Sequence, residues 1–145
     1  MKTRRFLIDI NVVLDLILAR APFDVEALKI FSLAEAKEVD LFLSSDAIST
    51  IAYLVEKNRN KQTARQTLAI LLDYVSLAPL DEEHVMKALA LDFSDIEDSL
   101  AAAVADSADV EAIITRNTKD FKNSPVPAIT PGEFMSGWDC GIRGA

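Results

Sequence analysis

The chain alternates between short apolar runs and longer segments with helical spacing. The short runs are rich in β-branched and aromatic residues and predict strands at residues 6–8, 40–43, 74–77, 112–115 and 125–129, the last flanked by prolines. The longer segments have apolar residues three and four apart and predict helices between these strands. Strands that alternate with helices are typical of a parallel sheet with right-handed crossovers, so the sequence predicts an α/β protein.

Breakers and capping residues predict where the helices begin and end. Asp24 is predicted to cap the second helix, Asp46 at the end of Ser44-Ser45-Asp46 the third, and Thr130, with Pro131 at the first helical position, the last. The predicted helices are, in chain order, 11–19, 24–37, one from 46 to the junction at 58–60, one from there to about 73, 81–91, 99–105 and a short one from 130.

Length and composition are those of one domain with a full hydrophobic core. The chain has 145 residues, of which 50% are hydrophobic, enough to form a core without disulfide bonds. We expect the domain to cover residues 1–137 and the Gly-rich residues 138–145 to form a flexible C-terminal tail. Asp9 and Asp15 interrupt the apolar segment near the N-terminus, which argues against a signal peptide or a membrane span and favours a cytoplasmic protein.

Charge and the rare metal-binding residue types narrow the chemistry. The single cysteine, Cys140, and the single histidine, His84, exclude a cysteine-rich or histidine-rich metal site. Any metal would be held by oxygen ligands, which favours Mg²⁺ or Mn²⁺. The net charge of −8 argues against wrapping of nucleic acid by the whole protein, but it is compatible with nucleic acid as a substrate.

A group of acidic and amide side chains is predicted to meet at the carboxyl edge of the sheet. Two follow the first strand, two follow the 112–115 strand and two lie one helical turn apart: Asp9 and Asn11, Asn117 and Asp120, Asp95 and Asp98. Like charges repel, so their convergence indicates a cation. Divalent ions held by carboxylates activate water and neutralise the leaving oxygen in phosphodiester cleavage. For Asp9 taken alone, capping of the following helix is an equal alternative.

The most basic run of the chain surrounds the predicted junction at 58–60. It contains no acid between Glu56 and Asp73 and consists of Lys57, Arg59, Lys61 and Arg65. Two interpretations stay open, a solvated helix face and a contact with phosphates of a nucleic acid backbone.

Three segments of the sequence together resemble the PIN-domain family, the fold of VapC-type toxin ribonucleases. They are residues 7–15 with Asp9-Ile10-Asn11, residues 92–98 with small residues behind them, and residues 114–121; residues 130–134 resemble a common closing segment. The resemblance implies a three-layer PIN-like fold, in which helices flank a central parallel sheet of short strands. It also implies a metal-dependent ribonuclease that uses Mg²⁺ or Mn²⁺, acts on RNA, dimerises and is covered by an antitoxin.

The resemblance also implies a role for particular residues. Asp9, Asp98 and Asp120 would be catalytic, and the metal would be held by Asp9, Asp98, Asn117 and Asp120. Thr115 would position the last acidic corner, Asn11 would orient Asp9, and Asp95 would be an outer ligand. The candidate RNA contacts, chosen for their charge beside the predicted edge, are Lys57, Arg59, Lys61, Arg65, Arg116 and Lys119.

One departure from the family pattern weakens the predicted site. The helix after the second strand has Thr50 where the family usually has Glu, and Asn117 stands where many relatives have Asp. Fewer negative charges mean weaker binding of hard cations, and neither Glu97 nor Glu56 obviously compensates. The alternative function is therefore a catalytically weakened PIN-like module that binds RNA or protein. An Asp-x-Asp phosphatase is disfavoured because Asn11 cannot transfer the proton, and a receiver domain because Lys119 follows no suitable strand.

Overall fold

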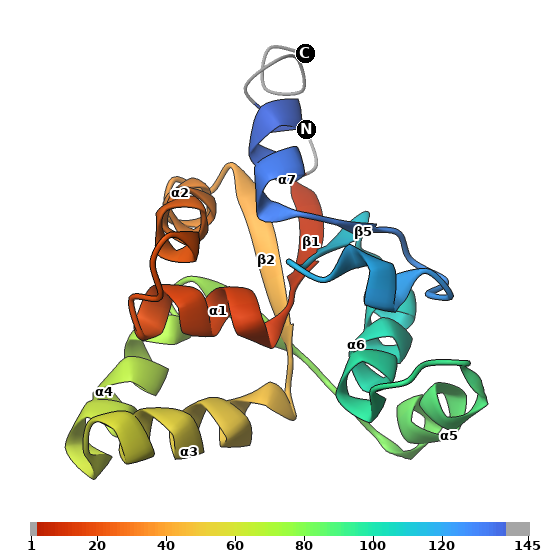
Figure 1. Ribbon diagram of the computed structural model, residues 1–145, viewed down its shortest axis with the longest axis horizontal. Coiled ribbons are helices and arrows are strands. Elements are labelled where there is room, and N and C mark those ends of the chain that lie inside the picture. The colour runs from red at the N-terminus through yellow and green to blue at the C-terminus, as the bar shows by residue number, and fades with distance from the viewer. Residues whose placement is uncertain (1–2, 139–145) are drawn as a thin grey trace.

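A five-stranded parallel sheet forms the centre of the computed structural model, which describes residues 3–138 (Figure 1). The strand order is β3-β2-β1-β4-β5, so the first strand lies in the middle. The strands are β1 (Arg4–Ile8), β2 (Val39–Ser44), β3 (Val75–Ala78), β4 (Ala112–Ile114) and β5 (Ala128–Ile129). The predicted parallel α/β sheet is confirmed, and each strand overlaps its predicted position, with the largest difference at β5, which begins three residues later than predicted.

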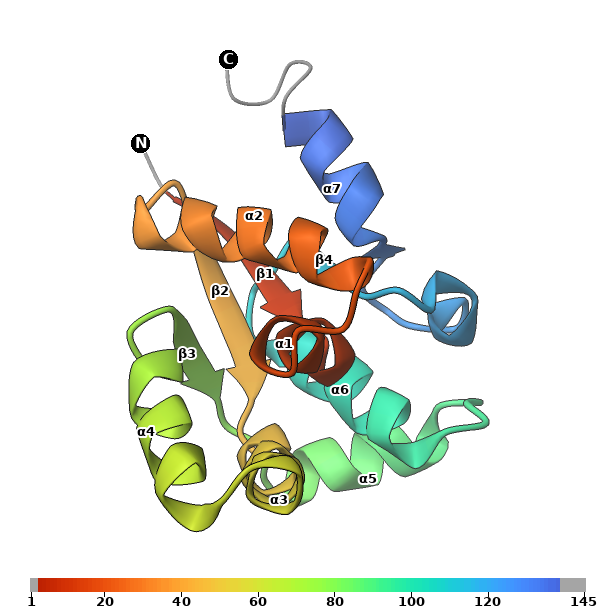
Figure 2. The ribbon, with the colours of Figure 1, turned by 60° about the vertical axis from the view of Figure 1, so that its left-hand side comes forward.

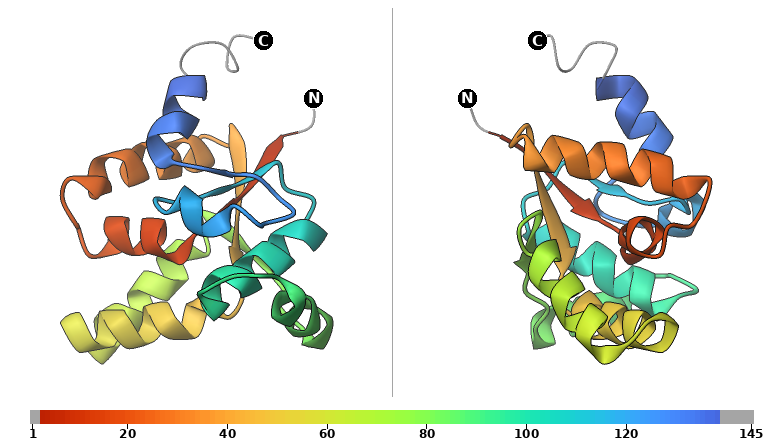
Figure 3. Two further views of the ribbon diagram at one scale, coloured as in Figure 1. Left: turned by 45° about the vertical axis from the view of Figure 1, so that its right-hand side comes forward. Right: turned by 90° about the vertical axis from the view of Figure 1, so that its left-hand side faces the viewer.

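Helices cover both faces of this sheet and make three layers. They are α1 (Ile10–Ile17), α2 (Phe23–Glu35), α3 (Ala47–Asn58), α4 (Lys61–Leu71), α5 (Glu82–Ala90), α6 (Ile96–Ser107) and α7 (Pro131–Gly137), with a short 3₁₀ helix η1 (Thr118–Phe121). Figure 3 shows the α3–α4 hairpin at the opposite end of the molecule from α7. Among residues 3–138, none of the helices has the length and apolar character needed to cross a membrane.

Alternation along the strands divides the core between the two faces of the sheet. Phe6 and Ile8 of β1 pack with buried residues of α1, α2, α3, α4 and α7. Leu7, between them in the sequence, packs on the other face with Ala102 and Ala105 of α6. The small side chains of α6 let this helix lie close to the sheet, as expected from the alanines behind the acidic segment.

Two helices begin earlier than predicted. Helix α2 begins at Phe23, directly after Pro22, so Asp24 lies in its first turn and is not its cap. Helix α6 begins at Ile96 because Asp95 caps it, accepting hydrogen bonds from the backbone N–H groups of Glu97 (2.8 Å) and Asp98 (3.3 Å). Asp98 is thereby held in the first turn of α6.

The end of the chain follows its predicted capping pattern. Thr130 caps α7 by accepting a hydrogen bond from the Glu133 N–H (3.0 Å), and Pro131 takes the first helical position. Trp138, the first residue of the predicted tail, is buried and stacks on Phe134 with the ring centroids 5.7 Å apart. Residues 139–145 of that tail, Cys140 included, lie outside the described residues.

Candidate active site

A polar hollow lies at the carboxyl ends of β1 and β2, bordered by α1, α3 and the first turn of α6. In Figure 2 the arrow of β1 ends at α1 and that of β2 ends at α3. The polar side chains that line the hollow come from all of these segments: Asp9, Asn11, Ser44, Asp46, Thr50, Asp95, Glu97 and Asp98. Parallel strands place their carboxyl ends at one edge of the sheet, so polar residues that are far apart in the sequence come together here.

Asp9 is the deepest acidic residue of the hollow. It follows β1 directly, its backbone N–H donates to the carbonyl oxygen of Ile114 (2.9 Å), and its exposed fraction is 5%. Burial raises the pKa of its carboxyl group, while hydrogen bonds from the side chains of Thr115 and Asn11 act in the opposite direction. Asp9 occupies the N-cap position of α1 without a full capping hydrogen bond from its side chain, but the backbone N–H groups of Ile10 and Asn11 also interact with this carboxylate and lower its pKa. The first turn of α1 therefore helps to stabilise the buried carboxylate, and capping stays an alternative role for Asp9.

Asp98 faces Asp9 from the first turn of α6. Its pKa is raised to about 7, first by burial and then by the negative charges of Asp9, Asp95, Asp120 and Glu97. The repulsion shows that two predicted catalytic carboxylates, Asp9 and Asp120, lie within electrostatic reach of the third, Asp98. At neutral pH, without a cation, Asp98 would hold a proton for part of the time.

Thr115 connects the ends of β1 and β4. Because Ile8 pairs with Ile114, the next residues, Asp9 and Thr115, lie side by side. The buried Thr115 hydroxyl donates to Asp9 Oδ2 (3.1 Å) and accepts a hydrogen bond from the Asn117 N–H (3.2 Å). Asn117 and Asp120 are exposed on the following loop and η1, outside the lining of the hollow, although the Asp120 charge reaches Asp98.

Arg116, predicted as an RNA contact, is engaged inside the protein. Its guanidinium donates to both carboxylate oxygens of Asp15 (2.7 and 3.1 Å) and lies over the ring of Phe23, 4.0 Å from the centroid. Asp15 is only 1% exposed, and Arg20 lies 3.7 Å from the same carboxylate. This ion pair connects the loop after β4 to α1. The Arg116 guanidinium is therefore already bound within the protein.

Asp46 belongs to the hollow but was predicted only as a helix cap. It accepts a hydrogen bond from the Ser44 hydroxyl and lies one turn before Thr50, which also lines the hollow. Its signal in the sequence was available, because Asp46 follows a buried strand much as Asp9 does. Of the two acids considered as compensation for Thr50, Glu97 lines the hollow, whereas Glu56 lines a separate one on the α3–α4 hairpin.

The donor atoms suit a hard divalent cation. Carboxylate, amide and hydroxyl oxygens surround the hollow, and the raised pKa of Asp98 reports a repulsion that a cation would relieve. Within residues 3–138, however, no three acidic, histidine or cysteine side chains lie close enough to form a complete ligand set. The side chains present thus provide part of a coordination shell, which water or substrate oxygens would complete.

The remaining predicted RNA contacts are exposed, and none of them lines the polar hollow. Lys57 lies in the last turn of α3 and Arg59 directly after its end, and within residues 3–138 neither forms an ion pair. Lys61 and Arg65 border the hollow of the α3–α4 hairpin that contains Glu56. Lys119 borders another, beside Asp92 and Asp120.

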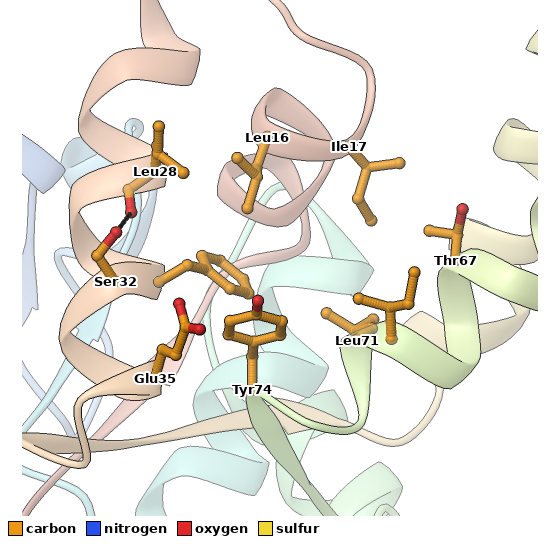
Figure 4. A pocket seen from close by; sticks show the side chains of 10 residues that line it. Leu16, Ile17, Leu28, Ser32, Glu35, Thr67, Leu71 and Tyr74 are labelled. Atoms are coloured by element: carbon orange, nitrogen blue, oxygen red, sulfur yellow. Dashed lines mark hydrogen bonds between the residues drawn. The ribbon is translucent and has the colours of Figure 1, made fainter.

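A second hollow, of opposite character, lies between α1, α2 and α4 (Figure 4). Its lining is mainly apolar and consists of Leu16, Ile17, Leu28, Phe31, Ser32, Glu35, Thr67, Ile70, Leu71 and Tyr74. Leu28 and Ile70 are each 57% exposed. We call this surface the apolar groove; it shares no lining residue with the acidic hollow.

Comparison with known proteins identifies the class. The family model of the PIN domain matches residues 5–119, so the chain belongs to the PIN-domain family. The predicted resemblance and the three-layer fold are thereby confirmed.

Individual relatives extend over nearly the whole chain. The chain is 27% identical over 147 residues to Ribonuclease VapC1 of Aquifex aeolicus (strain VF5). The alignment covers 96% of this chain and 99% of that protein. Among solved structures, DNA-bound VapBC from Salmonella typhimurium matches with a TM-score of 0.70 and 14% identity, covering 89% of this chain and 99% of the other. A toxin–antitoxin complex from Klebsiella pneumoniae matches with a TM-score of 0.64 and 25% identity, covering 86% and 96%.

Proposed function

We propose that this protein is a metal-dependent ribonuclease and the toxin of a toxin–antitoxin pair. The observation that carries the proposal is the gathering of Asp9, Asp46 and Asp98 in one hollow at the carboxyl edge of the sheet. Burial, and then the charges of Asp9 and its acidic neighbours, raise the pKa of Asp98 there to about 7. Carboxylates gathered at such an edge suit the metal-assisted cleavage of phosphodiester bonds. The similarity to a ribonuclease over nearly the full chain supports RNA as the substrate.

The residues of the hollow have distinct parts in this chemistry. Asp9 and Asp98 would hold Mg²⁺ or Mn²⁺, and water or substrate oxygens would complete the coordination shell. Asp46, which lines the same hollow, and Asn117 and Asp120, which lie outside its lining, would act as outer ligands. The bound metal would activate water and stabilise the charge on the leaving oxygen. Thr115 fixes the orientation of Asp9 through its hydroxyl group, and Asp95 fixes Asp98 by capping α6.

The apolar groove is the proposed binding surface for the antitoxin. Its exposed leucine and isoleucine side chains fit the apolar face of a partner helix, and the solved relatives include toxin–antitoxin complexes. The homodimer stays a prediction. Val85, Met86 and Leu89 of α5 form an exposed apolar stripe available for it, and sedimentation velocity would measure the oligomeric state.

Cleavage of an RNA panel with Mg²⁺ or Mn²⁺ tests the proposed activity. Asp9→Asn removes the deepest carboxylate charge and should lower the cleavage rate by more than about a hundredfold. Substitution of residues that only hydrogen-bond to a metal ligand already lowers activity by up to about a hundredfold. The matched control is Asp40→Asn, an exposed carboxylate at the opposite end of a neighbouring strand, which should cleave like wild type. Equal rates for wild type and Asp9→Asn would reject the catalytic assignment.

The second candidate function is an RNA- or protein-binding module with little catalysis. The observation that favours it is Thr50, a neutral side chain in the acidic hollow. RNA binding without cleavage at any concentration of Mg²⁺ or Mn²⁺ would favour this module over the enzyme.

A further inference from the structure

Helix α3 carries a stripe of side chains that leads out of the acidic hollow. Asp46, Thr50, Tyr53 and Lys57 are spaced four, three and four residues apart, so they lie on one side of the helix. The first two line the hollow. Another side of α3, with Ile51 and Val55, is buried in the core.

Tyr53 is the exposed aromatic residue of this stripe. Its exposed fraction is 63%, and within residues 3–138 its ring stacks on no other ring and its hydroxyl forms no hydrogen bond. Phe23, another exposed aromatic residue, is by contrast covered by Arg116. The Tyr53 ring is therefore available to a ligand.

Lys57 adds a positive charge one turn beyond Tyr53. Within the described part of the chain no carboxylate pairs with it, and Arg59 and Lys61 follow closely. With a rise of 1.5 Å per residue, Tyr53 lies about 4.5 Å and Lys57 about 10 Å from Thr50 along the helix axis. A strand of nucleic acid in the acidic hollow would thus meet an aromatic ring first and a cation next.

We propose that Tyr53 and Lys57 form a subsite for single-stranded RNA next to the cleavage site. A base stacks on the Tyr53 ring, and the neighbouring phosphate contacts the Lys57 ammonium. The inference rests on the proposed ribonuclease function and names the form of its substrate. A protein partner fits less well, because interface cores are depleted in lysine and acidic residues, and Glu56 and Lys57 lie three and four positions after Tyr53 on α3.

Tyr53 variants separate stacking from bulk in a binding assay. Fluorescein-labelled oligo(rA) and oligo(rU) are titrated by anisotropy into Asp9→Asn protein, with Mg²⁺ present, carrying Tyr53→Phe or Tyr53→Leu. Phe keeps an aromatic face and should bind like Tyr, whereas Leu should weaken binding about tenfold or more. Lys57→Gln should reduce the slope of log affinity against log salt by about one phosphate contact. Val25→Ala, at an apolar residue 56% exposed on α2, is the matched control and should change neither quantity.

Kinetics in the cleaving protein give a second readout. Tyr53→Leu should raise KM with little change in kcat, because the ring binds a base and does not act on the scissile bond. If the wild-type protein cleaves RNA and Tyr53→Leu changes neither RNA affinity nor KM, the subsite is overturned and the ribonuclease function stands. Binding that depends on Tyr53 without any cleavage would overturn the ribonuclease and leave the subsite standing. Sedimentation velocity that shows a changed oligomeric state in Tyr53→Leu, with RNA binding intact, would assign the stripe to a contact between copies and overturn the proposal.

Discussion

The acidic hollow and the apolar groove lie on either side of α1 and differ in almost every physical property. The acidic hollow is lined by carboxylates that repel one another, and the groove is lined by leucine, isoleucine and aromatic side chains. Both are open to solvent at a free-energy cost to the isolated protein, charge repulsion in one and exposed apolar area in the other. Each cost would be relieved by a different ligand, a cation in the first and an apolar helix in the second.

Helix α1 serves both surfaces because of its helical period. Asn11 and Leu14 line the acidic hollow, whereas Leu16 and Ile17 line the groove. Asp15 lies between these sets and holds Arg116. One short helix therefore borders both surfaces, and the ion pair between Asp15 and Arg116 holds it in position.

The largest expected effect comes from Asp15→Ala, which should damage both surfaces together. Asp15 is 1% exposed, and its removal leaves the Arg116 guanidinium partly buried without its partner. Loss of one member of a buried pair costs about 3–5 kcal/mol in unfolding free energy, toward the lower end here because Arg116 is partly exposed. Urea denaturation monitored by circular dichroism measures it, with Glu111→Ala, which breaks the exposed pair with Arg4, as the control. Equal stability of the two variants would contradict a structural role for Asp15.

Next in size is a change confined to the apolar groove. Leu28→Asp or Ile70→Asp places a charge where the proposed antitoxin helix docks and should weaken that complex by about a hundredfold, since desolvating an unpaired charge costs several kcal/mol. Co-purification with the antitoxin, sought as a small DNA-binding protein in the neighbouring reading frame, measures the loss, and RNA cleavage should be unchanged. Val25→Asp, at an exposed apolar residue of α2 that does not line the groove, is the matched control. Unimpaired complex formation would show that the groove is not the docking surface.

The two surfaces also differ in how far sequence alone predicted them. The strands, their parallel arrangement and the meeting of Asp9 with Asp98 follow from apolar runs and from the rule that carboxyl ends share an edge. The apolar groove was not predicted, because Leu16, Leu28 and Ile70 fit amphipathic helix patterns equally well whether a partner or the core covers them. The bond between Asp15 and Arg116 was also missed, since 101 residues separate them and only the packing of α1 on the β4 loop brings them together.

A smaller effect should follow from restoring charge in the acidic hollow. Thr50→Glu adds a carboxylate where Thr50 already lines the hollow, and it should tighten Mn²⁺ binding about tenfold because hard-cation affinity rises with ligand charge. Asp46→Asn should weaken binding by a similar factor. Isothermal titration calorimetry measures both, with Thr67→Glu in the apolar groove as the control for added charge alone. Opposite signs for Thr50→Glu and Asp46→Asn are the essential result, and a change of the same sign in both would refute the charge argument.

The smallest expected effect is on the pH dependence of stability, and it belongs to the acidic hollow alone. The pKa of Asp98 is about 7 in the folded protein, above its ordinary value of about 3.9 in an unfolded chain. Between these two pKa values the folded state binds more protons at Asp98 than the unfolded state does. The contribution of Asp98 to the stability of the metal-free protein is therefore complete below about pH 4 and is lost as the pH rises toward about 7. Because Asp98 is only partly buried, the expected fall in Tm is a few degrees. Asp98→Asn should flatten the fall between pH 5 and 8, Leu28→Asp in the groove should leave it intact, and Mn²⁺ should reverse it in wild type by favouring the carboxylate. A pH profile of Tm identical in wild type and Asp98→Asn would mean that the carboxylates of the hollow do not repel one another enough to call for a cation.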